Sequence, residues 1–145
     1  MRTNLSSQIT LNRVSTKYYK PENAVERSVL TRFEKVPTDI YESVDEGVCH
    51  IANEIAGKIQ DRQREGKFFV IGAGTGASLR PLYAELVRKH KDEGLSFRNV
   101  VIFNLYEYYP LAPESAGSSF AQLKELFVDQ IDIDKQNVFT IDGSI

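Results

Sequence analysis

Residues 67–78 read KFFVIGAGTGAS, an apolar run followed by three alternate glycines and then by hydroxyl-bearing residues. The uninterrupted run at residues 68–71 is typical of a strand that is buried on both faces of a parallel sheet. Apolar residues then return at helical spacing, and Gly94 is placed to end that helix; they are Leu79, Leu82, Tyr83, Leu86 and Val87. The stretch therefore predicts a strand, a tight turn and a helix, which is the repeating unit of an α/β fold.

The chain on either side continues this alternation. Ser43 and Glu46 have the spacing of a capping box, and they predict a helix from about residue 44 to Gly66. One face of that helix carries Val44, Val48, Ile51, Ile55 and Ile59. Residues 100–103 predict a second buried strand, residues 120–127 a helix after a polar loop, and residues 138–141 a final strand. Because strands that alternate with helices imply parallel crossovers, we expect an α/β fold with an open, mainly parallel, Rossmann-like sheet flanked by helices.

Residues 1–34 are polar and are interpreted as an N-terminal extension, with the α/β domain in residues 35–145. Pro21 opens a short helical pattern in the extension, which we expect to pack on the domain. Residues 35–41 alternate apolar and polar side chains through Val36 and Ile40. Pro37 limits this segment to an edge strand, or to the approach to one, because proline lacks the N–H that a sheet needs.

Composition narrows the class of protein. The 145 residues, 41% hydrophobic, suffice for one globular domain with a core, and 18 basic residues nearly balance 20 acidic ones. This balance favours neither a nucleic-acid partner nor an anionic membrane, and no stretch approaches the roughly 18 apolar residues of a membrane span. Cys49 is the single cysteine, so we expect no disulfide framework and a reducing, cytoplasmic setting. His50 and His90 form no metal-ligand spacing, and we expect no metal.

The glycine turn follows the carboxyl end of a predicted strand, where parallel sheets collect their ligands. Its glycines allow close backbone approach, and its N–H groups and hydroxyls suit an anion of phosphate size. A nucleoside triphosphate would need a lysine directly after the glycines, but the next one is Lys89. A dinucleotide fits the G-x-G-x-x-A spacing, although Asn104 stands where its ribose needs a carboxylate. A sugar phosphate, or a tight turn that holds no ligand, stays possible at this point.

A second constellation, FNLYEYYPL, occupies residues 103–111 after the next predicted strand. Glu107 lies there among Tyr106, Tyr108 and Tyr109, at the sheet edge that the glycine turn shares. Desolvation beside aromatic rings can raise the pKa of a carboxylate, which suits proton abstraction next to a carbonyl. The alternative is a solvated loop glutamate whose tyrosine neighbours cap the core.

Taken together, the motifs resemble the glucosamine-6-phosphate deaminase/isomerase family of the wider 6-phosphogluconolactonase-like group. The resemblance rests on the glycine-threonine-glycine turn, a helix ending in HKDEG, the strand SFRNVV, the segment FNLYEY, and the tail SSFAQLKELFVDQIDIDKQNVFTIDG. It covers roughly residues 35–143. It implies conversion of glucosamine 6-phosphate to fructose 6-phosphate and ammonia through an enolamine, without metal or nucleotide cofactor.

The resemblance also assigns residues. It places the substrate phosphate on the turn formed by Gly74, Thr75, Gly76, Ala77 and Ser78. The family usually carries an aspartate as the C2 base where this chain has Tyr106, and a neutral phenol is a poor base. Glu107 is then the candidate general base.

The family's later segment GIG-x-DGH-x-AFNEP, which supplies the ring-opening histidine, lies downstream of the matched region. We therefore expect an incomplete, N-terminal portion of the family domain that is catalytically incomplete in isolation. We also expect a homo-oligomer, because a sheet without its later elements leaves an apolar face or edge uncovered. A non-catalytic sugar-phosphate-binding module and, less favoured, a dinucleotide-binding domain are the alternatives.

Overall fold

The computed structural model describes residues 21–36 and 38–144, which divide into two compact units between Ser43 and Val44. The first unit contains helix α1 (Ala24–Thr31), whose start is capped by Asn23: the side chain accepts a hydrogen bond from the N–H of Glu26 at 2.9 Å. The predicted short helix is therefore confirmed. None of its residues is buried, and its packing on the domain stays a prediction. Residues 1–20 of the predicted extension and Pro37 lie outside the described residues.

The predicted edge strand at residues 35–41 is wrong for the part that the structure describes, since residues 34–36 and 38–43 contain no strand. Val36 and Ile40 are 72% and 55% exposed. Alternation of apolar and polar residues makes a strand only where a neighbouring strand supplies hydrogen bonds, and none does so here. The assignment of residues 1–34 and 35–145 to an extension and a domain stays a prediction.

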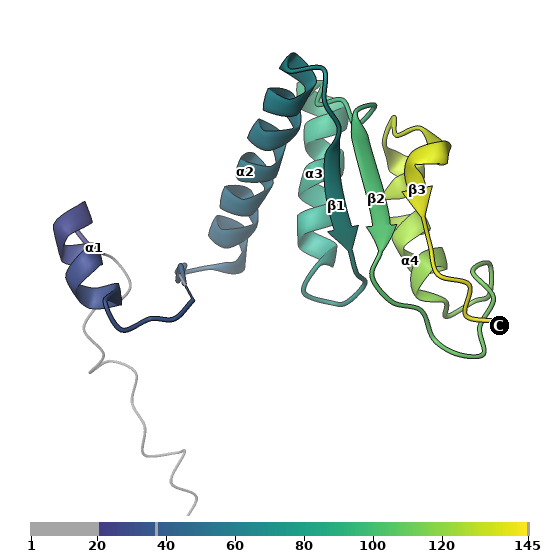
Figure 1. Cartoon of the computed structure of the whole chain (residues 1–145), viewed down its shortest axis with the longest axis horizontal. Coiled ribbons are helices and arrows are strands. Elements are labelled where there is room, and N and C mark those ends of the chain that lie inside the picture. The colour runs from purple at the N-terminus through teal and green to yellow at the C-terminus, as the bar shows by residue number, and fades with distance from the viewer. Residues whose placement is uncertain (1–20, 37, 145) are drawn as a thin grey trace, which may run out of the picture. The chain divides into compact units, whose positions relative to one another are not determined.

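The second unit is an α/β layer built on three strands (Figure 1). Its elements are α2 (Val44–Arg64), β1 (Phe69–Ala73), α3 (Arg80–Glu93), β2 (Val100–Asn104), α4 (Ser119–Leu126), 3₁₀ turns at Val128–Gln130 and Lys135–Asn137, and β3 (Val138–Phe139). The strands are all parallel in the order β1-β2-β3. The predicted α/β class and open parallel sheet are confirmed, with strand ends shifted by one or two residues. Gly94 ends α3 with φ of 73°, as predicted.

The core lies on one face of the sheet, against α3 and α4, which stand behind the strands in Figure 1. Val100 and Ile102 of β2 are fully buried there, together with Leu123 of α4. Aromatic rings join the layers: Tyr83 of α3 stacks on Phe127 at 4.9 Å between ring centroids. This packed face holds the strands in place, and with them the loops that follow their carboxyl ends.

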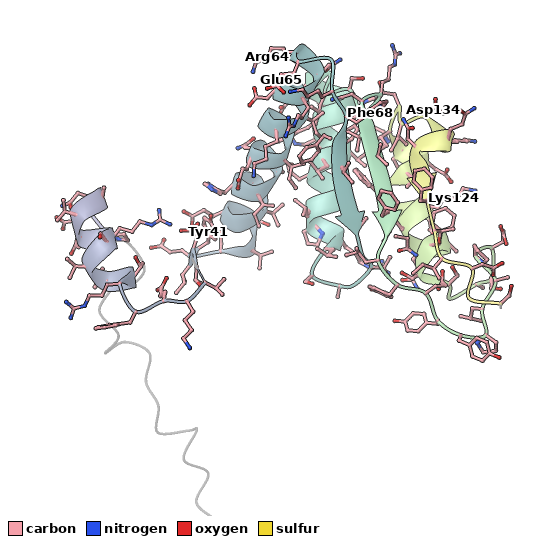
Figure 2. All side chains as sticks on the ribbon, in the orientation of Figure 1. Tyr41, Arg64, Glu65, Phe68, Lys124 and Asp134 are labelled. Carbon is pink, nitrogen blue, oxygen red and sulfur yellow. The ribbon has the colours of Figure 1, made fainter. Side chains whose placement is uncertain are left out.

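The opposite face is open among the described residues. Val70, Phe103 and Phe139 are 59%, 45% and 47% exposed, and the two phenylalanine rings stack on each other at 4.9 Å. Phe68, directly before β1, is also exposed (Figure 2). The prediction that residues 68–71 are buried on both faces is therefore wrong, because the helices cover only one side of this sheet.

Helix α2 also differs from the predicted packing. In the predicted apolar stripe, Ile59 is fully buried, but Val44 and Ile51 are 69% and 43% exposed. The other buried residues of the helix are Gly47 and Ala52. The helix packs mainly on α3. Gly47 and Ala52 are small residues, which allow close approach between two helices, and the buried face of α2 includes both of them. No helix in the described ranges has both the length and the apolar character needed to cross a membrane.

Candidate functional site

The turn between β1 and α3 lies at the carboxyl ends of the strands, beside the loop that leaves β2 (Figure 1). Ala73 pairs with Asn104, so the two strands end level, and the N–H of Leu105 donates to the carbonyl of Ala73 at 2.9 Å. The predicted meeting of the glycine turn and the FNLYEY segment is confirmed by this register.

The exposed part of the turn presents a run of backbone donors. Within the described part of the chain, no hydrogen bond engages the N–H groups of Gly76, Ala77 and Ser78, and all three residues are exposed. The N–H of Leu79 donates to the carbonyl of Gly76 at 3.1 Å and closes the turn. Helix α3, which starts here, has no side-chain cap at its N-terminus. Free N–H groups at such a terminus form a site for an anion.

Arg80, the first residue of α3, is an exposed cation next to these N–H groups. A positive side chain in the first turn of a helix is unfavourable, because the helix dipole is positive there. Arg80 was not among the site residues predicted from the sequence, although its positive charge beside a predicted anion site was a usable signal.

Tyr106 fastens the inner part of the turn. Its hydroxyl oxygen accepts from the N–H of Thr75 at 2.9 Å and lies 3.0 Å from the Thr75 hydroxyl; it also donates to the Thr75 carbonyl. The ring lies over Gly74, where an added Cβ would stand 3.2 Å from the Tyr106 ring carbon Cε1. The Tyr83 hydroxyl donates to the Gly74 carbonyl at 2.6 Å. The hydrogen bond from the Thr75 hydroxyl, followed by that from its backbone N–H, lowers the pKa of Tyr106.

Ser119 reaches the same point from the start of α4. Its hydroxyl lies 2.9 Å from the Thr75 hydroxyl and 3.4 Å from the side-chain oxygen of Asn104. Ser119 is fully buried and Asn104 is 4% exposed. Ser119 was not predicted from the sequence, because no local pattern shows that a helix start 44 residues away meets the turn.

Glu107 points at the first turn of α4. Its carboxylate accepts from the Ser118 hydroxyl at 2.6 Å, the Ser119 N–H at 2.7 Å, the Phe120 N–H at 3.0 Å and the Tyr108 N–H at 2.9 Å. Burial raises the pKa of Glu107, but these hydrogen bonds outweigh burial and lower the pKa to about 2.

The expected rise in the pKa of Glu107 is therefore wrong: aromatic neighbours were visible in the sequence, whereas the donors of α4 were not. Its role as general base stays a prediction. Its contacts show that the Glu107 carboxylate binds the N-terminus of α4, where an anion is stabilised by the free N–H groups.

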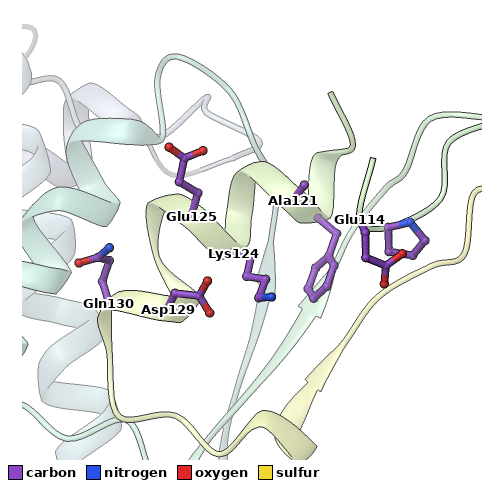
Figure 3. A pocket seen from close by; sticks show the side chains of 8 residues that line it. Glu114, Ala121, Lys124, Glu125, Asp129 and Gln130 are labelled. Atoms are coloured by element: carbon purple, nitrogen blue, oxygen red, sulfur yellow. The ribbon is translucent and has the colours of Figure 1, made fainter. Parts of the chain in front are cut away.

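Other polar features lie elsewhere. The His90 ring nitrogen Nδ1 is 2.7 Å from the carbonyl of Leu95, which precedes β2 at the opposite end of that strand. Within residues 21–36 and 38–144, no three histidine, cysteine or acidic side chains are grouped so that they could hold a metal ion. A hollow of about 350 Å³ lies over α4 between Glu114, Lys124 and Asp129 (Figure 3), and no residue of the turn lines it.

No protein-family model matches the chain. Over all 145 residues it is 61% identical to a putative glucosamine-6-phosphate deaminase-like protein of Bacteroides thetaiotaomicron, of which it spans 22%. It is 35% identical over 104 residues to the glucosamine-6-phosphate isomerase of Candida albicans, a match that covers 72% of this chain and 41% of that protein.

A solved structure of a monomeric glucosamine-6-phosphate deaminase, described as a missing link of the NagB superfamily, superposes with a TM-score of 0.67 at 27% identity. The superposition covers 72% of this chain and 42% of that one. The chain thus spans less than half the length of each of these proteins. The sequence and the fold of the chain both match the N-terminal part of glucosamine-6-phosphate deaminases.

Proposed function

We propose that the chain forms the phosphate-binding part of a glucosamine-6-phosphate deaminase, and that the turn from Gly74 to Ser78 holds the phosphate group of the sugar. The observation that carries this proposal is that the N–H groups of three exposed residues, Gly76, Ala77 and Ser78, have no hydrogen-bond partner among the described residues, directly before the uncapped 14-residue helix α3. A phosphate there gains backbone hydrogen bonds and the helix dipole together. Arg80 adds a cation whose position is favourable only with an anion beside it.

The reaction of the longer protein, by its relatives' names, is deamination and isomerisation of glucosamine 6-phosphate. Proton transfer at C2 needs an accessible base. In this chain the Tyr106 oxygen is engaged at Thr75, and the Glu107 carboxylate accepts four hydrogen bonds. These contacts favour, for the isolated chain, the second candidate function of a sugar-phosphate-binding module without turnover. Catalysis then depends on groups from outside these 145 residues.

Calorimetric titration of the chain with glucosamine 6-phosphate tests the proposal, with unphosphorylated glucosamine and a nicotinamide dinucleotide as controls. We expect saturable binding of the phosphorylated sugar alone. Arg80→Gln should weaken it by roughly 3- to 10-fold, because one charge near an exposed anion contributes on the order of 1 kcal/mol. Arg98→Gln is the matched control: Arg98 is 81% exposed and pairs with Asp132. Equal affinity for both sugars, or binding of the dinucleotide alone, would contradict the proposal.

We also propose that the hexosamine phosphate is bound without metal or nucleotide, in a cytoplasmic setting. Assembly into a homo-oligomer is part of the same proposal. An exposed apolar surface on the sheet supports this association; it is formed by Val70, Phe103 and Phe139.

A further inference from the structure

We propose that Ser119 is a positioning residue that turns the Thr75 hydroxyl into a hydrogen-bond donor for the bound phosphate. This inference rests on the function proposed above. Ser119 is the first residue of α4, and its buried hydroxyl lies between that helix and the glycine turn.

The Tyr106 hydroxyl has one proton, which goes to the Thr75 carbonyl. The same oxygen accepts from the Thr75 N–H. In its contact with the Thr75 hydroxyl at 3.0 Å, the Tyr106 oxygen must therefore accept, and Thr75 must donate. The Thr75 hydroxyl has then used its only proton, so in its contact with the Ser119 hydroxyl it can only accept.

Ser119 completes this arrangement. Its oxygen lies 2.9 Å from the Thr75 hydroxyl and 3.4 Å from the Asn104 side-chain oxygen, so its proton is placed better for Thr75. Full burial removes water as a competing partner. The N–H of Ser119 is bound to Glu107 at 2.7 Å, which fixes the residue at the start of α4. Glu107 therefore acts on the turn through the position of Ser119.

The proton direction matters for an anion. If the Thr75 proton were held by the buried Ser119 oxygen, Thr75 would offer only lone pairs to a phosphate oxygen, and these would repel it. Because Ser119 donates to Thr75, the Thr75 proton points away from Ser119 and toward the Tyr106 oxygen. Thr75 is only half-buried, so its hydroxyl can transfer this hydrogen bond from the Tyr106 oxygen to a phosphate oxygen when the ligand arrives.

A double-mutant cycle on the 145-residue chain tests the inference, with glucosamine 6-phosphate as the titrant. Thr75→Val keeps the shape and removes the hydroxyl, and should weaken binding roughly 10-fold or more, as expected for a hydrogen bond to a charged group. Ser119→Ala should weaken it by about 3- to 10-fold. The double variant should bind as Thr75→Val does, within about twofold, because Ser119 acts through Thr75.

Ser96→Ala is the matched control, since its hydroxyl binds Asp132 at 2.8 Å, ahead of β2; its affinity should equal that of the parent. Thermal unfolding of each variant separates loss of fold from loss of binding. If Ser119→Ala does not fold, Ser119→Cys leaves no cavity, replaces the hydroxyl by a weak donor and is expected to give the same loss of affinity.

Two results overturn the inference alone: unchanged affinity in the folded Ser119 variants, or a Ser119 effect that adds in full to that of Thr75→Val. Failure of the parent chain to bind glucosamine 6-phosphate is visible before any variant is made. That result would overturn the proposed function and, with it, this inference.

Discussion

At the scale of single residues, Glu107 shows how neighbours decide what a carboxylate does. Flanking tyrosines suggested a desolvated base, but the carboxylate collects a hydroxyl and three N–H groups within 2.6 to 3.0 Å. Each of these donors favours the charged form. The result is an anion that neutralises the start of α4, whereas the start of α3 has no side-chain cap.

We predict that Glu107→Gln destabilises the second unit by about 2 kcal/mol, because an amide presents its own N–H to buried donors and leaves at least one unpaired. Urea unfolding at neutral pH measures this loss. Glu125→Gln on the exposed side of α4 is the control and should change stability by less than about 0.5 kcal/mol. Equal unfolding midpoints for Glu107→Gln and the parent would refute the anchoring role.

The pH dependence of the unfolding free energy provides a separate test of the role of Glu107. Its pKa in the folded chain, about 2, lies below the ordinary value of 4.5. The unfolded chain therefore binds the proton first, and the stabilisation is complete above about pH 4.5 and is lost as pH falls toward 2. Glu107→Gln should show a smaller loss of stability between these two values than the parent does. Identical slopes of unfolding free energy against pH in this window would argue against the lowered pKa.

At the scale of elements, the segment after β3 returns to the loop that carries Glu107. Gly143 is buried there, and an added Cβ would stand 2.5 Å from the carbonyl oxygen of Leu111 and 2.6 Å from that of Tyr108. Both are backbone atoms, which cannot rotate away as the end of a side chain can. This contact ties the last described segment to the loop beside the candidate site.

We predict that Gly143→Ala destabilises the unit by roughly 2 kcal/mol or more, because the extra methyl group must push the loop backbone aside. Gly57→Ala is a matched control of opposite sign. Gly57 lies in α2 with nothing within 4 Å of an added Cβ, and alanine favours a helix over glycine by about 0.5–1 kcal/mol. Chemical denaturation of both variants measures the two effects. A Gly143→Ala variant as stable as the parent would contradict the prediction, because it would show that the loop backbone moves aside at little cost in free energy.

At the scale of the whole molecule, the sheet has one packed face and one open face among the described residues. Parallel sheets are normally covered on both faces. The exposed rings of Phe103 and Phe139, stacked on each other beside Val70, form an apolar surface that spans all three strands.

We predict that the chain associates through this surface, so that light scattering at rising concentration gives a mass of at least twice 16.4 kDa. The double variant Val70→Ser/Phe139→Ser should shift the mass toward the monomer, because it removes apolar area from the contact. Val25→Ser, at an even more exposed apolar site in α1, is the control and should leave the association unchanged. A parent chain that stays monomeric at every concentration would exclude this assembly.

By itself the sequence determined the local elements and their order, because periodicity, capping residues and glycines act over a few neighbouring positions. It predicted the helix after the turn, the stop at Gly94 and a parallel sheet. It failed where partners are distant: Tyr106 meets Thr75 across 31 positions and Ser119 meets it across 44. The pKa of Glu107, the buried face of α2 and the open side of the sheet were decided by tertiary structure alone, since burial and hydrogen bonding depend on which elements are brought together.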